Sequence, residues 1–210
     1  MSSAKNYTIK ALLSVAVIAI ALTIFILKFY ARSNSEIVDS FRGINPGGLR
    51  HTILTDLAIS RGEEIVPELI EASYQDDPKY RSSLIRVLGS IGGDLAVARL
   101  VELAVAGDDL EGNLWTAISF SQDPRFIPIL EEKLKENLTE RERGNVLITL
   151  AEIGGRGQLR ELLEYMKKTE LRGHFYRSNR AFEDIADKQF NKDVSQIESW
   201  LERNLGEPRR

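Results

Sequence analysis

Residues 81–104 read RSSLIRVLGSIGGDLAVARLVELA, and this stretch decides the fold. Its first apolar series is Leu84, Leu88 and Ile91. Spacings of four and three residues place such a series on one face of a helix. A second apolar series follows at residues 97–101, after Gly92-Gly93. Glycine is typical of a helix end because it adopts the left-handed conformation readily. The stretch therefore predicts two helices joined by a tight turn.

The same pattern recurs along the chain from residue 49. The first apolar series begins at residues 53, 84, 114, 146 and 178, at intervals of 31, 30, 32 and 32. The second begins at residues 66, 97, 127, 159 and 197. Arg61-Gly62, Gln122-Asp123 and Gly154-Gly155 occupy the turn positions equivalent to Gly92-Gly93. No stretch alternates polar and apolar residues as a strand would. Since one helix pair is too small to bury its own apolar faces, the repeat predicts an all-α fold, a right-handed α-solenoid of about five helical hairpins over residues 49–206.

Capping signals mark several predicted helix starts. Asp77-Pro78 and Asp123-Pro124 each place an N-cap residue before a proline at the first helical position. Asp94 is suited to cap a helix that begins at Leu95. Residues 139–142, Thr-Glu-Arg-Glu, have the form of a capping box.

Residues 81–104, together with NVLITLAEIGG at 145–155 and QLRELLEYM at 158–166, resemble HEAT-type repeats, most of all the short form also found in phycobilisome lyases. The resemblance extends over roughly residues 49–205 and concerns architecture, although the 31-residue period is shorter than the usual ~40–47. In this family the second helix of each pair commonly lines the concave surface. The resemblance therefore implies a partner-binding role for polar residues on the second helices. These candidates are Glu68, Glu71, Arg99, Glu102, Lys135, Arg160 and Glu164.

Residues 11–27, ALLSVAVIAIALTIFIL, carry no charge. The apolar character extends over residues 9–30, and a helix of that length spans about 33 Å, enough for a hydrocarbon core of about 30 Å. The sequence predicts a transmembrane helix at 9–30, an N-terminal tail at 1–8, a polar linker at 31–48 with room for a short helix around 36–42, and a C-terminal tail at 207–210. A cleaved signal peptide is the alternative, although no small-x-small site follows the apolar run.

The charges on either side of residues 9–30 are nearly balanced, so they decide the orientation only weakly. The short N-terminal tail favours a single-pass protein of a bacterial inner membrane with the repeat region outside, in the periplasm. The partners expected on this interpretation are the lipid bilayer, through residues 9–30, and another protein that is itself membrane-associated.

The sequence offers little catalytic chemistry. Because the chain has no cysteine, disulfides, thiolate metal sites and cysteine nucleophiles are excluded. His51 and His174 do not stand at metal-ligand spacing and are expected to be surface or partly packed residues. Trp115 and Trp200 are expected in the core. No phosphate-binding or nucleophile motif is present, and the sequence indicates no catalytic residue, no metal and no cofactor.

Charge is distributed unevenly. Residues 36–155 contain 12 basic and 21 acidic side chains, a net charge of −9, whereas residues 156–210 contain 12 and 10, a net charge of +2. A basic cluster stands out near one connection: Lys167, Lys168, Arg172, Arg177 and Arg180. The overall charge of −3 argues against a nucleic-acid binder. The uneven distribution suggests that the two ends of the repeat region meet partners of different sign.

These observations favour a membrane-tethered, non-catalytic helical-repeat scaffold that binds another protein. The alternative is a lyase-like or cofactor-handling HEAT-repeat enzyme at the membrane. Nucleic-acid binding is the third and weakest hypothesis, because the early repeats are acidic.

Overall fold

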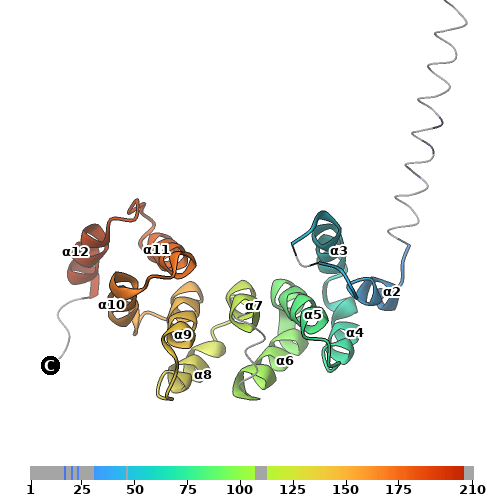
Figure 1. Cartoon of the computed structure of the whole chain (residues 1–210), viewed down its shortest axis with the longest axis horizontal. Coiled ribbons are helices and arrows are strands. Elements are labelled where there is room, and N and C mark those ends of the chain that lie inside the picture. The colour runs from blue at the N-terminus through green and yellow to red at the C-terminus, as the bar shows by residue number, and fades with distance from the viewer. Residues whose placement is uncertain are drawn as a thin grey trace, which may run out of the picture.

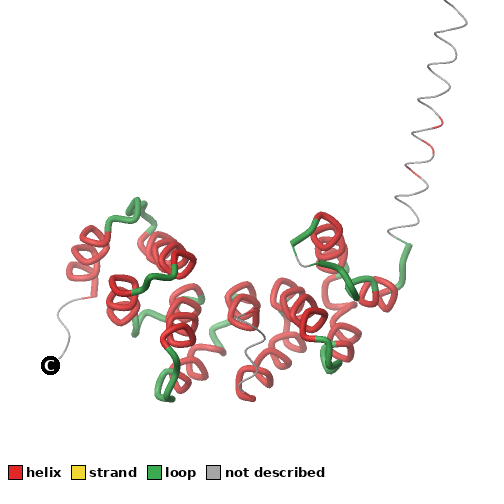
Figure 2. Tube along the Cα trace, in the orientation of Figure 1, coloured by secondary structure: helices red, strands yellow, loops and turns green. Residues whose placement is uncertain are grey.

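The structure is a computed structural model that describes residues 17, 20, 23, 31–45, 47–106 and 113–205. In these residues the chain is all-α, as predicted, with helices and connecting loops and no strand (Figure 2). The five first helices are α3 (Leu49–Ser60), α5 (Pro78–Ile91), α7 (Asn113–Ser121), α9 (Glu140–Glu152) and α11 (Arg172–Ala186). The five second helices are α4 (Val66–Ala72), α6 (Gly93–Ala106), α8 (Phe126–Lys133), α10 (Leu159–Lys168) and α12 (Val194–Leu205). Helix α2 (Asn34–Asp39) precedes them, and the short helix η1 (Gly62–Ile65) joins α3 to α4.

The helices lie in two rows along an arc (Figure 1). The first helices form the inner, concave row, in which α3 contacts α5, α5 contacts α7, α7 contacts α9 and α9 contacts α11. The second helices lie on the outer side of the arc (Figure 1). The expectation that the second helices line the concave surface is therefore wrong.

The predicted turns between paired helices are confirmed. Gly62, Gly92, Gln122 and Gly154 all have positive φ, at 60°, 68°, 50° and 91°, and Asp187 has φ 48° at the end of α11. Each first helix is therefore followed by a residue with positive φ, at which the chain turns toward its second helix.

Two of the predicted caps are confirmed and two are wrong. The Asp77 side chain accepts hydrogen bonds from the backbone N–H groups of Lys79 and Tyr80 at the start of α5. Thr139 forms a complete capping box with Glu142 at the start of α9. Asp94 instead lies inside α6, which already begins at Gly93. Asp123 accepts from the backbone N–H of Arg125 in the turn before α8, and the helix begins two residues later than predicted, at Phe126.

The core forms two apolar clusters that meet at α5. One cluster runs from α2 to α5 and includes Ala96 of α6, and the other runs from α5 to α12. Trp115 is buried in the second cluster, as expected, and Trp200 is half-buried against it, with its ring at 6.1 Å from that of Phe190. Neighbouring helices thus share each layer of the core, and no helix pair has a core of its own.

The segment expected as a linker packs against the first helix pair. Ser33 caps α2 in a capping box with Glu36, and Ile37, Val38 and Phe41 are buried among residues of α3 to α5. At the opposite end α12 packs on α10 and buries Ile197 and Leu201. Both ends of the helix array are therefore covered by a helix with one apolar face.

No helix in the described residues is long and apolar enough to cross a membrane. This finding contradicts the expected single-pass anchor and the expected bacterial inner-membrane location. The expected transmembrane helix at 9–30 lies outside the described residues, apart from Val17, Ile20 and Thr23. The tails expected at 1–8 and 207–210 also lie outside them.

Candidate interaction site

Helix α6 is apolar on almost every side. Its 14 residues include only three charged ones, Asp94, Arg99 and Glu102, and an all-round apolar helix is normally buried on all sides. Helix α6 instead lies in the outer row, where Leu95 is 60% exposed and Val105 is 72% exposed. Ala98, which lies between them on the same side of the helix, is also exposed. We call Leu95, Ala98 and Val105 the α6 face.

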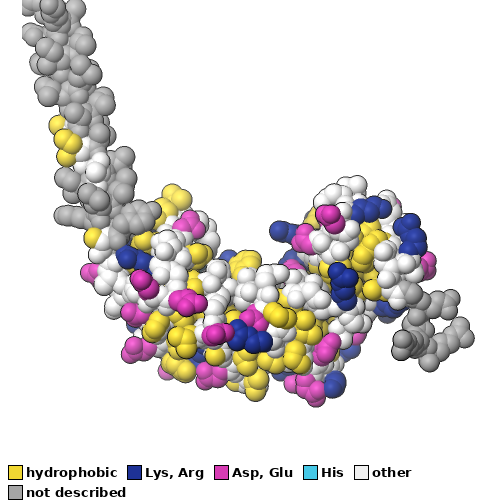
Figure 3. Space-filling view, turned by 180° about the vertical axis from the view of Figure 1, so that it is seen from behind, with side chains coloured by type: hydrophobic (Ala, Val, Ile, Leu, Met, Phe, Trp, Pro, Cys, Tyr) yellow, Lys and Arg dark blue, Asp and Glu magenta, His cyan; other side chains and the backbone are white. Residues whose placement is uncertain are grey.

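Acidic side chains surround the α6 face. In Figure 3, which shows the molecule from behind, apolar side chains gather over the outer side of the arc with Asp and Glu side chains among them. Glu63, Glu71, Asp94 and Glu102, which we call the acidic rim, are exposed on α6 itself or on the neighbouring η1 and α4. Apolar surface rimmed by polar residues is typical of a protein-interaction site.

One buried arginine organises the edge of this surface. Arg99 is only 6% exposed, and its Nε donates to Ser73 Oγ at 3.0 Å. Its Nη1 lies 2.8 Å from Glu102 Oε2, and its guanidinium lies 3.8 Å from the centre of the Tyr74 ring. The Tyr74 hydroxyl also donates to Glu102 Oε2, at 3.4 Å. The hydrogen bond from Arg99 lowers the pKa of Glu102 below its ordinary value. The buried Arg99 thus contacts both Tyr74 and Glu102, whose side chains are exposed. We call this pair the Tyr74–Glu102 anchor.

The structure brings only part of the predicted partner-binding set together. Arg99 and Glu102 are in contact, and Glu71 is exposed on the neighbouring helix α4. Glu68, also on α4, is partly buried, and its Oε2 atom is buried without a hydrogen-bond partner. The remaining three are spread along the outer side beyond α6. Lys135 lies after α8 and pairs with Glu132 at 2.5 Å, Arg160 is partly exposed on α10, and Glu164 pairs with Lys167 at 3.0 Å.

The predicted basic cluster is largely occupied by ion pairs. Lys167 contacts Glu164 at 3.0 Å and Glu198 at 2.8 Å, so that it joins α10 to α12. These two carboxylates raise the pKa of Lys167. Arg180 pairs with Asp184 at 3.7 Å on the surface of α11. Lys168 and Arg172 are exposed.

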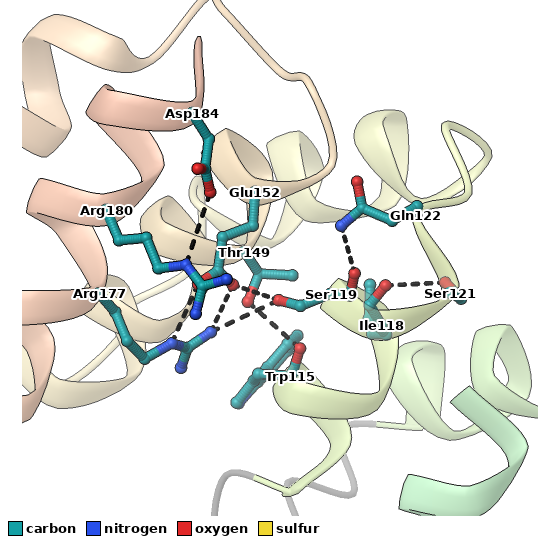
Figure 4. A network of polar contacts seen from close by, with 10 residues as sticks. All are labelled: Trp115, Ile118, Ser119, Ser121, Gln122, Thr149, Glu152, Arg177, Arg180 and Asp184. Carbon is teal, nitrogen blue, oxygen red and sulfur yellow. Dashed lines mark hydrogen bonds and ion pairs between the residues drawn. The ribbon is translucent and has the colours of Figure 1, made fainter. Parts of the chain in front are cut away.

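Arg177 belongs to a polar network that joins three first helices (Figure 4). Its Nε donates to Glu152 Oε1 at 3.1 Å, and its Nη2 donates to Glu152 Oε2 at 2.5 Å and to Ser119 Oγ at 3.4 Å. Ser119 in turn donates its hydroxyl proton to Glu152. Trp115 and Thr149 lie beside the network, with Thr149 Oγ1 donating to the carbonyl of Trp115 at 3.5 Å (Figure 4). These contacts tie α7, α9 and α11 together, so the network has a structural role.

The two histidines also have structural partners. His51 is buried, contrary to expectation, and its Nε2 lies 3.1 Å from Ser83 Oγ. The Ser83 hydroxyl donates to the carbonyl of Lys79, which leaves its oxygen to accept from His51. His174 is partly buried, as expected, and its Nδ1 lies 2.5 Å from the Tyr165 hydroxyl. In the part of the chain that the structure describes, no group of three or more His, Asp or Glu side chains is placed to hold a metal ion.

Sequence reasoning missed the α6 face, although the signal was present. The run LAVARLVELAVA at 95–106 has too few polar residues for a surface helix, and that pattern by itself predicts either burial on all sides or an exposed apolar face. The Arg99–Tyr74 stack carried no such signal, because it joins α6 to the turn that follows α4 in the preceding helix pair.

Comparison of the chain with protein-family models, with curated proteins and with solved structures finds no match. The resemblance to HEAT-type repeats, including the form found in phycobilisome lyases, is therefore not supported, and neither is the membrane anchor that accompanied it.

Proposed function

We propose that the chain is an α-solenoid of helical hairpins that acts as a non-catalytic scaffold and binds a helix of another protein on its outer side. The α6 face carries this proposal, because it exposes Leu95, Ala98 and Val105 to solvent on a helix whose exposed side has only two charged residues, Asp94 and Glu102. Covering such a surface releases about 25 cal/mol for each Å² of apolar area removed from water.

The shape of α6 suits a helical partner. Leu95, Ala98, Glu102 and Val105 follow one another at spacings of three, four and three residues, which produces a ridge along the helix with a small residue, Ala98, between larger ones. A partner helix can approach most closely at Ala98 and can pack its own apolar side chains against Leu95 and Val105.

The support for α6 is rigid. Helix α6 packs against α4, α5, α7 and α8, and its buried side includes Val97, Leu100 and Leu103. A surface that is already ordered loses little conformational entropy when a partner binds. The five turns with positive φ and the two rows of helices support the solenoid part of the proposal.

Site-specific crosslinking in cells tests the proposal. A photoreactive amino acid replaces Ala98 on the α6 face or, as a control, Gly173 at the exposed start of α11. The proposal expects crosslinks to a defined partner from position 98 but not from position 173. The double variant Leu95→Asp with Val105→Asp should abolish them, whereas Leu49→Asp, which changes a 78% exposed leucine of α3, should not. Crosslinks from position 98 that survive the double variant would refute the proposal.

A further inference from the structure

We infer that the helix bound on the α6 face is amphipathic and basic, and that one of its Lys or Arg side chains binds the Tyr74–Glu102 anchor. This inference rests on the proposed function and specifies the chemistry of the partner.

Charge around the α6 face selects a basic partner. The exposed side chains of the acidic rim are Glu63, Glu71, Asp94 and Glu102. Arg125 pairs with Asp94 at 3.0 Å, but it is shared with Asp123 at 2.7 Å, so this group of three keeps a net negative charge. Arg99 neutralises Glu102, which leaves Glu63 and Glu71 as further negative charges on the neighbouring η1 and α4. A partner helix with Lys or Arg beside its apolar face meets complementary charge here, and an acidic helix would be repelled.

The Tyr74–Glu102 anchor can accept a cation directly. Both contacts of Glu102, from Arg99 and from Tyr74, go to its Oε2 atom. Its side chain is 57% exposed, so a further cation can reach the carboxylate from solvent. Tyr74 is exposed beside it, and Arg99 covers only one face of its ring. A carboxylate oxygen next to an aromatic ring is a favourable place for an ammonium or guanidinium group.

Arg99 is the positioning residue of this anchor. It is buried, so it does not itself reach the partner, but it fixes Tyr74 by stacking and Glu102 by a charged hydrogen bond. Without Arg99, both side chains would have to be ordered when the partner binds, which weakens binding. Removing Arg99 also makes the surface more negative, and charge alone would then strengthen the binding of a basic peptide. Loss of ordering and added negative charge therefore change the affinity for a basic peptide in opposite directions, so a variant of Arg99 distinguishes between them.

The test measures the affinity of a fluorescent helical peptide of leucine and lysine for the full chain, by fluorescence anisotropy at several salt concentrations. The peptide has about 14 residues, the length of α6, with leucine on one face. A leucine–glutamate peptide of the same pattern is the control ligand. The variants are Arg99→Met, Glu102→Gln and the α6-face double variant, and Glu202→Gln, on the exposed side of α12, is the matched charge control.

We expect the lysine peptide to bind and the glutamate peptide to bind at least about tenfold more weakly. Glu102→Gln should weaken binding of the lysine peptide about three- to tenfold and reduce its salt dependence. Arg99→Met should weaken it by a similar factor in spite of the added negative charge, while Glu202→Gln should leave it unchanged. Circular dichroism of each variant checks that the fold is retained.

Three results would overturn the inference: equal binding of the two peptides, tighter binding by Arg99→Met, or unchanged binding by Glu102→Gln. Each of them leaves the proposed function standing if crosslinking from position 98 still depends on Leu95 and Val105. Failure of that crosslinking test removes the proposed function itself, whatever the peptides do.

Discussion

For the substitution Gly89→Ala, the structure and helix propensity predict opposite changes in folding stability. Gly89 lies in the interior of α5, where alanine is intrinsically the better helix former by about 0.5–1 kcal/mol. It is buried against α7, however, and a Cβ atom at this position would lie within 3.0 Å of the O, Cα and C atoms of Ala117. We therefore expect the alanine variant to be less stable.

The size of the stability loss depends on which atoms the added Cβ atom would contact. All three belong to the backbone of α7, so no side-chain rotation removes the overlap, and α5 and α7 have to move apart. Inserting a methyl group into a packed core costs about 1–3 kcal/mol, and an overlap with backbone atoms belongs to the upper part of that range, so that after subtraction of the propensity gain a net loss of about 1–2 kcal/mol remains. In a chain of this size that loss lowers the melting temperature by about 2–8 °C.

The assay is urea and thermal unfolding followed by circular dichroism at a helical wavelength. The matched control is Gly173→Ala in α11, where an added Cβ meets nothing within 4 Å and stability should rise by up to about 1 kcal/mol. The double variant Gly89→Ala with Ala117→Gly should not recover the loss, because the overlap is with backbone atoms. A Gly89→Ala variant as stable as the parent chain would refute the close approach of α5 and α7.

Three further predictions concern polar contacts. A double-mutant cycle with Arg177→Met and Glu152→Gln should give a coupling energy of about 1 kcal/mol by urea unfolding, since the pair is only partly shielded from solvent; additive losses would contradict the network. Thr139→Ala should lose about 1 kcal/mol and Thr139→Ser much less, in the same assay, because serine keeps the capping hydroxyl. Burial lowers the pKa of His51 and of His174, so the unfolded chain binds protons more readily below about pH 6.5. Their contribution to stability should be complete above that pH and be lost as the pH falls through the lowered pKa values. His51→Gln should therefore flatten the dependence of melting temperature on pH between about 7.5 and 5.5, and an unchanged slope would show that His51 does not contribute.

Local patterns predicted the helices well. The apolar spacing of residues 84–91 and the two glycines after it lead directly to α5 and to the turn of positive φ at Gly92, and Thr139 caps α9 as its capping-box pattern indicated. These features depend on residues within one or two helical turns of each other. Asp94 failed as a cap because α6 begins two residues earlier than predicted, at Gly93, and the carboxylate pairs with Arg125 instead.

Local sequence patterns could predict only part of the candidate site. Glu71, Arg99 and Glu102 were selected as polar residues of second helices, and the structure places all three on α4 and α6. Sequence patterns could not show that Arg99 is buried beneath Tyr74, because the two residues are 25 positions apart and their contact depends on how two helix pairs stack. For the same reason the charges of Lys167 and Arg177 looked free in the sequence, but both are paired with carboxylates from other helices.

The 31-residue period, the helix-ending turns and the capping boxes are local properties, and they were sufficient to determine an all-α chain of paired helices. Only the tertiary structure decided which row of helices lies on the inside of the arc and which face of α6 stays exposed. The physical reason is that helices such as α6 and α9 are apolar on more than one side, so their own patterns permit several ways of stacking. Contacts such as Gly89 against Ala117 and Arg177 with Glu152 select one of them.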